Sequence, residues 1–184
     1  MADKSLTRKS ARELVAMIKA RAVSPVEVLD AHLAVIARVN PKLNAIVTLA
    51  AEQANGNARA VEAAVMRGER LGALAGLPVA IKDITPTAGI RTTFGSPLYK
   101  DYVPEEDAEA VSRLKAAGAI VLGKTNTPEF ATGANTVNAL FGATRNPWNC
   151  ALSPAGSSGG SAVAVATGMV PICLLYTSPS PRDS

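Results

Sequence analysis

The chain has 184 residues and a net charge of +4, and 48% of its residues are hydrophobic and 18% charged. These proportions are typical of one globular domain and exclude a disordered chain. The basic residues are scattered singly instead of forming a stripe with aromatic residues, so we expect no direct binding of nucleic acid.

The cysteines and the hydropathy of the chain indicate the cellular compartment in which we expect the protein. Cys150 and Cys173 are the only cysteines, and their spacing fits neither a disulfide framework nor a metal site. The N-terminus lacks the apolar stretch of a signal peptide. The uncharged run over residues 161–180 is interrupted by glycine and proline, so its apolar part is shorter than the roughly 20 residues that a membrane helix needs. We therefore expect a cytoplasmic protein that contacts no membrane.

Helical patterns dominate the N-terminal third. Ser10 and Ser24 each begin a capping box followed by apolar residues at helical spacing, and the second of these helices is expected to end at Pro41. An alanine-rich third helix is expected over about residues 48–66. The single histidine, His32, has no evident catalytic partner nearby, so we expect it to be structural.

A different pattern begins at about residue 76. Residues 76–83 predict a buried strand, residues 107–117 an amphipathic helix, and residues 119–123 a second buried strand. A strand, a crossover helix and another strand predict an α/β fold with a largely parallel sheet. A further helix is expected to start at residues 127–129, with Phe130 facing inward.

Lys82 stands at the end of the first predicted strand, directly after apolar residues. Such a lysine either extends its ammonium group to solvent or is desolvated. Desolvation would lower its pKa, so that the neutral amine could act as a base. The strand alone leaves both interpretations open.

A serine- and glycine-rich stretch over residues 153–161 precedes an apolar run that predicts a buried helix. A phosphate-binding P-loop would need a lysine here, and none follows. Residues 156–160 fit the G-x-S-x-G pattern of a nucleophile elbow, which would make Ser158 the nucleophile, but Pro154 argues against the strand that this elbow requires, and no histidine follows. A serine activated by lysine remains, as does a flexible loop without chemistry.

Four consecutive blocks of the chain resemble the amidase signature family, and the similarity extends over nearly all of residues 6–172. The blocks are residues 76–83, 123–130, 145–149 and 153–168. The resemblance implies an amidase-signature fold, in which helices cover a mixed, largely parallel sheet. Residues 1–172 are then the N-terminal part of one amidase domain, with a helical arm over about residues 6–68 and an α/β core from about residue 74.

The resemblance also implies a Ser-cisSer-Lys triad that hydrolyses small-molecule amides without a metal or an organic cofactor. Lys82 matches the family's base and Ser157 its bridging serine, which lies next to a cis peptide bond and relays a proton from the nucleophile. Ala131 aligns with a position whose backbone contacts substrate, so Ala131 and Ser157 are the expected substrate-binding residues.

One part of the family's pattern is missing. The family's nucleophilic serine follows the bridging serine by 24 residues, where this chain has Pro181. Residues 173–184 lack periodicity and resemble translated adaptor or vector sequence. We therefore expect a fold that is incomplete at its C-terminus, no nucleophile, and no amide hydrolysis by the chain as it stands.

The resemblance leaves three interpretations. Residues 127–133 differ from the Asp-Glu-Phe-Ala-Met-Gly type of the A subunit of the tRNA-dependent amidotransferase, which favours a free-standing amidase. The glutaminase-type A subunit is the alternative within the family, and a truncated, non-catalytic binding protein is the alternative outside it. A homodimer is an open possibility for the full-length protein.

Overall fold

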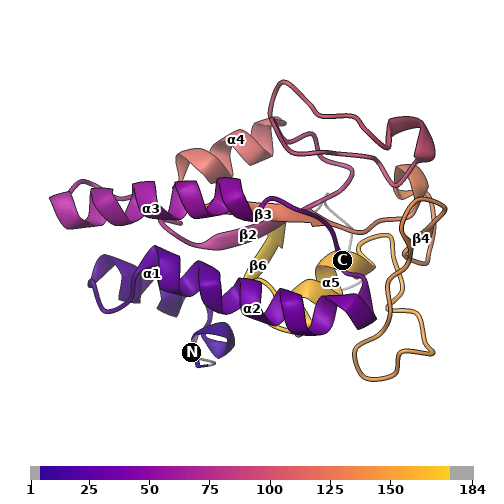
Figure 1. The fold of residues 1–184 in the computed structure, drawn as a ribbon, viewed down its shortest axis with the longest axis horizontal. Coiled ribbons are helices and arrows are strands. Elements are labelled where there is room, and N and C mark those ends of the chain that lie inside the picture. The colour runs from indigo at the N-terminus through magenta and orange to yellow at the C-terminus, as the bar shows by residue number, and fades with distance from the viewer. Residues whose placement is uncertain (1–4, 175–184) are drawn as a thin grey trace, which may run out of the picture.

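The computed structural model describes residues 5–174, which are arranged around one four-stranded sheet (Figure 1). The helices are α1 (Ala11–Lys19), α2 (Pro25–Leu43), α3 (Ala51–Arg67), α4 (Glu109–Ala116) and α5 (Gly159–Ala166), with 3-10 turns at Leu6–Arg8, Pro97–Tyr99 and Glu129–Ala131. The strands are β1 (Ile46–Leu49), β2 (Pro78–Lys82), β3 (Ile120–Thr125), β4 (Val137–Asn138), β5 (Gly142–Ala143) and β6 (Ile172–Leu174).

The main sheet has the strand order β1-β3-β2-β6. Strand β2 is parallel to both β3 and β6, whereas β1 is antiparallel to β3. Strands β4 and β5 form a separate antiparallel pair. The predicted α/β fold with a mixed, largely parallel sheet is confirmed.

Helices cover both faces of this sheet (Figure 1). On one face Ala80 of β2 packs in a cluster with Leu29 of α2 and Val163 of α5. On the other face Val79 of β2 packs with Val111 of α4. Every residue of β2 and β3 is buried, which explains why the two strands read as apolar runs in the sequence.

A bulge in β3 decides which of its residues face α2 and α5 and which face α4 on the other side of the sheet. Val79 pairs with Val121, but the next residue, Ala80, pairs with Gly123, so β3 contains one extra residue at this point. Beyond the bulge Lys82 pairs with Thr125.

Two predicted helix boundaries are wrong. Helix α2 does not end at Pro41 but continues to Leu43, because a proline in the last turn removes only one hydrogen bond and Asn44 then ends the helix in the left-handed conformation (φ +52°). The third helix begins at Ala51 and not at residue 48, because Ile46–Leu49 is extended and pairs with β3 as β1.

The expectation for Phe130 is also wrong. Residues Glu129–Ala131 form only a 3-10 turn in which Phe130 has φ +49°, and its side chain is 44% exposed. Its ring lies edge-on to Tyr99, with the centroids 6.1 Å apart, so it joins a surface aromatic group instead of the core.

Within residues 5–174 no helix combines the length and the apolar character needed to cross a bilayer. Of the segment interpreted as foreign, Cys173 and Leu174 belong to β6, where they pair with Ala80 and Ile81. The remainder, residues 175–184 with Pro181, lies outside the described residues.

Candidate active site

Lys82 and two consecutive serines meet where β2 ends and α5 begins. Lys82 Nζ donates hydrogen bonds to Ser157 Oγ at 2.8 Å and to Ser158 Oγ at 2.9 Å. The sequence places these residues far apart, and the fold joins them because parallel strand ends and helix starts gather at one edge of an α/β sheet.

The serines occupy the irregular segment that leads into α5. Ser158 is the residue before the helix, and its side chain makes no capping hydrogen bond. The peptide bond between Gly156 and Ser157 is cis. Both hydroxyls therefore lie at the positive end of a helix, next to the lysine.

Burial sets the electrostatics of Lys82, whose side chain is only 2% exposed. Desolvation lowers the pKa of its ammonium group, and the nearby thiol of Cys173 acts weakly in the opposite direction. The interpretation in which Lys82 extends to solvent is therefore wrong. A lowered pKa increases the neutral fraction of the amine, which is the form able to accept a proton.

A buried hydroxyl pair lies on the same face of the sheet as Lys82. Thr125 of β3, which pairs with Lys82, has its Oγ1 2.7 Å from Ser161 Oγ of α5. Thr125 Oγ1 also lies 3.9 Å from the sulfur of Cys173. These contacts fix the first turn of α5 against the sheet.

Thr136 and Thr127 hold the serine segment in place, and sequence analysis did not identify either. Thr136 donates from its backbone N and its Oγ1 to the carbonyl of Ala155, at 3.2 and 3.0 Å, and its Oγ1 accepts from the Gly159 amide at 2.9 Å. Thr127 Oγ1 donates to the Ser157 carbonyl at 3.4 Å.

Ala131 is half-buried in the 3-10 turn and has φ +59°. Its amide donates to the Pro128 carbonyl at 2.9 Å. Among the described residues no hydrogen bond connects Ala131 to Lys82 or Ser157, so its link to substrate stays a prediction.

Lys124 and Asp83 form a second buried charged group on the opposite face of the sheet. Lys124 is fully buried, and its pKa is lowered to about 8, chiefly by burial. Asp83 is also fully buried, and burial raises the pKa of its carboxyl group although Thr93 donates to it and Lys124 attracts it. This pair borders the strand end that carries Lys82.

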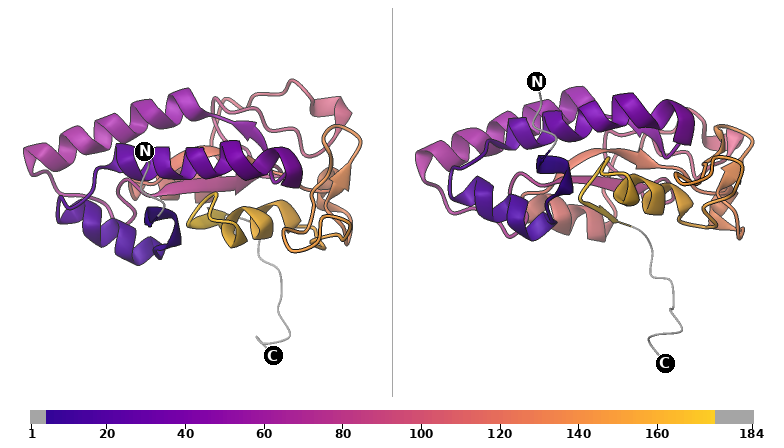
Figure 2. Two further views of the ribbon diagram at one scale, coloured as in Figure 1. Left: turned by 60° about the horizontal axis from the view of Figure 1, so that its bottom comes forward. Right: turned by 90° about the horizontal axis from the view of Figure 1, so that it is seen from below.

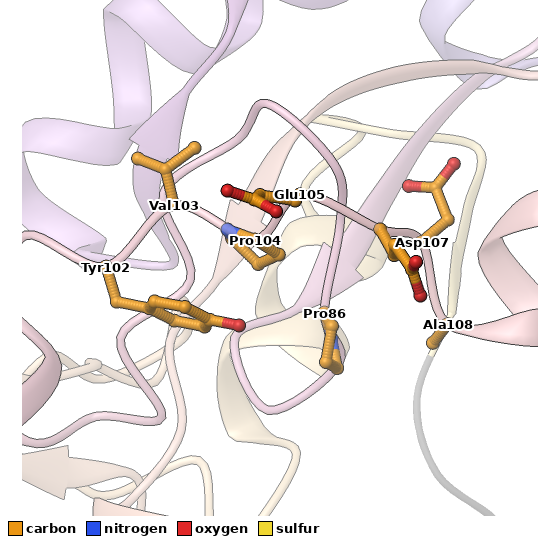
Figure 3. A pocket seen from close by; sticks show the side chains of 8 residues that line it. Pro86, Tyr102, Val103, Pro104, Glu105, Asp107 and Ala108 are labelled. Atoms are coloured by element: carbon orange, nitrogen blue, oxygen red, sulfur yellow. The ribbon is translucent and has the colours of Figure 1, made fainter.

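A separate surface pocket lies in the loop between β2 and α4 (Figure 3). It is lined by Pro86, Tyr102, Val103, Pro104, Glu105, Glu106, Asp107 and Ala108. Of its three acidic residues, Asp107 is paired with Lys115, whose Nζ lies 2.8 Å away. Neither Lys82 nor Ser157 lines this pocket.

Residues 27–174 match the sequence model of the Amidase family. The chain belongs to the amidase signature family. This confirms the resemblance on which the residue assignments were based.

Two curated relatives within the amidase signature family carry the name of the A subunit of glutamyl-tRNA(Gln) amidotransferase. The one from Acidothermus cellulolyticus is 49% identical over 169 residues, which are 92% of this chain and 34% of that protein. The one from Carboxydothermus hydrogenoformans is 49% identical over 165 residues, 90% of this chain and 34% of that protein. The chain thus spans about a third of the length of these relatives.

Solved structures agree with this membership. A bacterial aryl acylamidase of the amidase signature family superposes with a TM-score of 0.84 at 36% identity, over 88% of this chain and 34% of that one. Fatty acid amide hydrolase superposes with a TM-score of 0.88 at 26% identity, over 94% of this chain and 30% of that one. The amidase-signature fold is therefore confirmed.

Proposed function

We propose that the full-length protein is an amidase that hydrolyses the carbon–nitrogen bond of small carboxamides, with Lys82 as the base and Ser157 as the proton relay. The 2.8 Å hydrogen bond between Lys82 Nζ and Ser157 Oγ carries this proposal. The nucleophilic serine is assigned to a position outside residues 5–174.

In this mechanism neutral Lys82 accepts the proton of Ser157 Oγ while Ser157 takes the proton of the nucleophile. The nucleophile attacks the amide carbonyl, and the proton returns along the same path to the departing amine. Water then hydrolyses the acyl-enzyme. The buried position of Lys82 supports the first step, because it favours the neutral amine.

The test uses the complete protein expressed from the source gene and measures ammonia release from benzamide and from glutamine. We expect Lys82→Ala and Ser157→Ala each to lower kcat by about 100-fold or more, the usual contribution of proton transfer by a positioned group. Ser112→Ala, on the exposed side of α4, is the matched control and should leave kcat unchanged. Near-normal turnover in either site variant would refute the proposal.

A second candidate is the A subunit of a tRNA-dependent amidotransferase, favoured by the 49% identity to relatives with that name. Residues 127–133 favour the free-standing enzyme instead. The same assay separates the two candidates. A free-standing amidase cleaves benzamide by itself, whereas the glutaminase component of an amidotransferase releases ammonia from glutamine and needs its partner chains.

A further inference from the structure

Ser158 has no role in the amidase proposed above, yet its hydroxyl oxygen lies 2.9 Å from Lys82 Nζ. A serine at this position before a helix usually accepts a hydrogen bond from an amide of the first turn. Ser158 makes no such bond. Its hydroxyl is directed to the buried lysine instead.

The pair has the composition of a serine–lysine catalytic dyad. In such enzymes a neutral lysine removes the proton of a serine hydroxyl, which then attacks a carbonyl group. Lys82 is 2% exposed, so its surroundings favour the neutral amine. Ser158 is partly exposed, so it lies nearer to solvent than the buried lysine.

The position of Ser158 also favours the developing negative charge. Helix α5 spans the eight residues Gly159–Ala166 and begins directly after Ser158. The positive end of a helix dipole stabilises an anion there. Ser157 is one residue further from the helix, and its carbonyl is held by Thr127.

We infer that Ser158 and Lys82 form a working dyad in the chain itself, which is acylated by activated esters such as p-nitrophenyl acetate. Lys82 Nζ takes the proton of Ser158 Oγ as this oxygen bonds to the ester carbonyl carbon. The bond from that carbon to the phenolate oxygen breaks, and its electron pair leaves with p-nitrophenolate. Lys82 then loses this proton to solvent. Water adds to the acetyl-serine, acetate leaves, one proton of the water restores the serine hydroxyl and the other passes to solvent.

The leaving group limits this reaction to esters. A p-nitrophenolate ion departs without a proton, whereas an amine must be protonated as it leaves. The dyad therefore acts on activated esters and not on amides. This inference does not rest on the amidase proposal, because it requires no residue beyond those described.

The experiment incubates the 184-residue chain with p-nitrophenyl acetate and follows p-nitrophenolate release and the site of acetylation by peptide mass spectrometry. We expect acetylation of Ser158 as an ester that alkaline hydroxylamine removes. Ser158→Ala and Lys82→Met should each slow acetylation about 100-fold, the usual size of base catalysis. Ser153→Ala, in the exposed part of the same loop, and Lys100→Met, on the surface, are matched controls with unchanged rates.

Ser158→Ala removes a single oxygen and leaves the hydrogen bond between Lys82 and Ser157 in place. Its acetylation rate therefore tests the role of Ser158 even if Lys82→Met does not fold. Three results would overturn the inference: an unchanged rate in Ser158→Ala, acetylation of Ser157, or acetylation confined to amines as hydroxylamine-resistant amides.

Discussion

Lys124 is the largest side chain that the described part of the molecule buries completely. Its Nζ donates to the Thr85 carbonyl at 2.5 Å and to the hydroxyls of Thr87 and Thr92, both at 2.9 Å. Asp83 lies near enough to attract it. A buried ammonium group is tolerated only with such partners, so Lys124 ties the loop after β2 to β3.

Replacing Lys124 with methionine should therefore destabilise the protein. The substitution leaves three oxygens without their donor, and each buried polar group left unsatisfied costs about 1–3 kcal/mol, so we expect a loss of about 3 kcal/mol or more. Lys115→Met is the matched control: Lys115 pairs with Asp107 but its side chain is 31% exposed, so the expected loss is at most about 1 kcal/mol. Urea denaturation measures both, and equal losses would contradict the prediction.

Among single residues, the sequence predicted best those that lie in the blocks resembling the amidase signature family. The pairing of Lys82 with Ser157 followed from the resemblance, and the structure places the two within hydrogen-bonding distance, although their catalytic roles stay a prediction. Thr127 and Thr136 could not be predicted, because they act through loop backbone on partners 19 to 30 positions away. A threonine in a polar loop has no periodic signal that would single it out.

Helix α5 packs closely against the polypeptide backbone around it. A Cβ atom on Gly160 would lie 2.5 Å from both the N and the O of Asn126, and one on Gly159 would lie 2.5 Å from Thr136 Oγ1. The two glycines thus let the first turn of α5 lie directly against the segment after β3. This contact places Ser157 and Ser158 at the end of β2.

Two glycine-to-alanine substitutions test this packing. Gly160→Ala should destabilise the protein by about 1–3 kcal/mol, the usual cost of overpacking, because backbone atoms cannot yield. Gly56→Ala, in α3, should stabilise it by about 0.5–1 kcal/mol, because nothing lies within 4 Å of the new Cβ and alanine favours a helix. Urea midpoints measure both, and a stabilising Gly160→Ala would show that α5 is not held by this contact.

The prediction of secondary structure from the sequence failed at β1, where pairing with another strand decides the structure and the local residue pattern does not. Residues Ile46–Leu49 are too few to show a clear alternation and adjoin an alanine-rich helix, so β1 is recognisable only from its pairing with β3. Strands β2 and β3 were predicted because both are buried on two faces and read as apolar runs between turns. The bulge after Val121 left no trace in the sequence, yet it decides the pairing of Lys82 with Thr125.

Across the whole molecule, one buried histidine connects distant parts of the chain. His32 of α2 is fully buried, and its Nδ1 donates to the Gly168 carbonyl at 2.9 Å, 136 residues away in sequence. Gly168 lies just after the end of α5, close to the backbone oxygen of Thr7. Helix α2 lies beside α5 in both views of Figure 2. His32 therefore joins the N-terminal layer to the helix that carries the serines.

This histidine should make the stability of the protein depend on pH. Its Nε2 is buried without a hydrogen-bonding partner among residues 5–174, and burial lowers the pKa of the imidazole although the Gly168 carbonyl opposes the shift. The unfolded chain then binds the proton more readily than the folded one. The contribution of His32 is complete above about pH 6.5, the ordinary value for histidine, and is lost progressively as the pH falls below it.

Urea denaturation of wild type and His32→Gln at about pH 7.5 and about pH 5.5, on either side of the ordinary histidine pKa, tests this dependence. Glutamine retains a donor for the Gly168 carbonyl but does not titrate, so the variant should lose less stability on acidification than wild type. Asp83 acts in the opposite direction, because its raised pKa favours the folded state as the pH falls. Since Asp83 is present in both proteins, the difference between their two pH-dependent losses isolates His32, and equal losses would exclude it as the acid-sensitive contact between α2 and the end of α5.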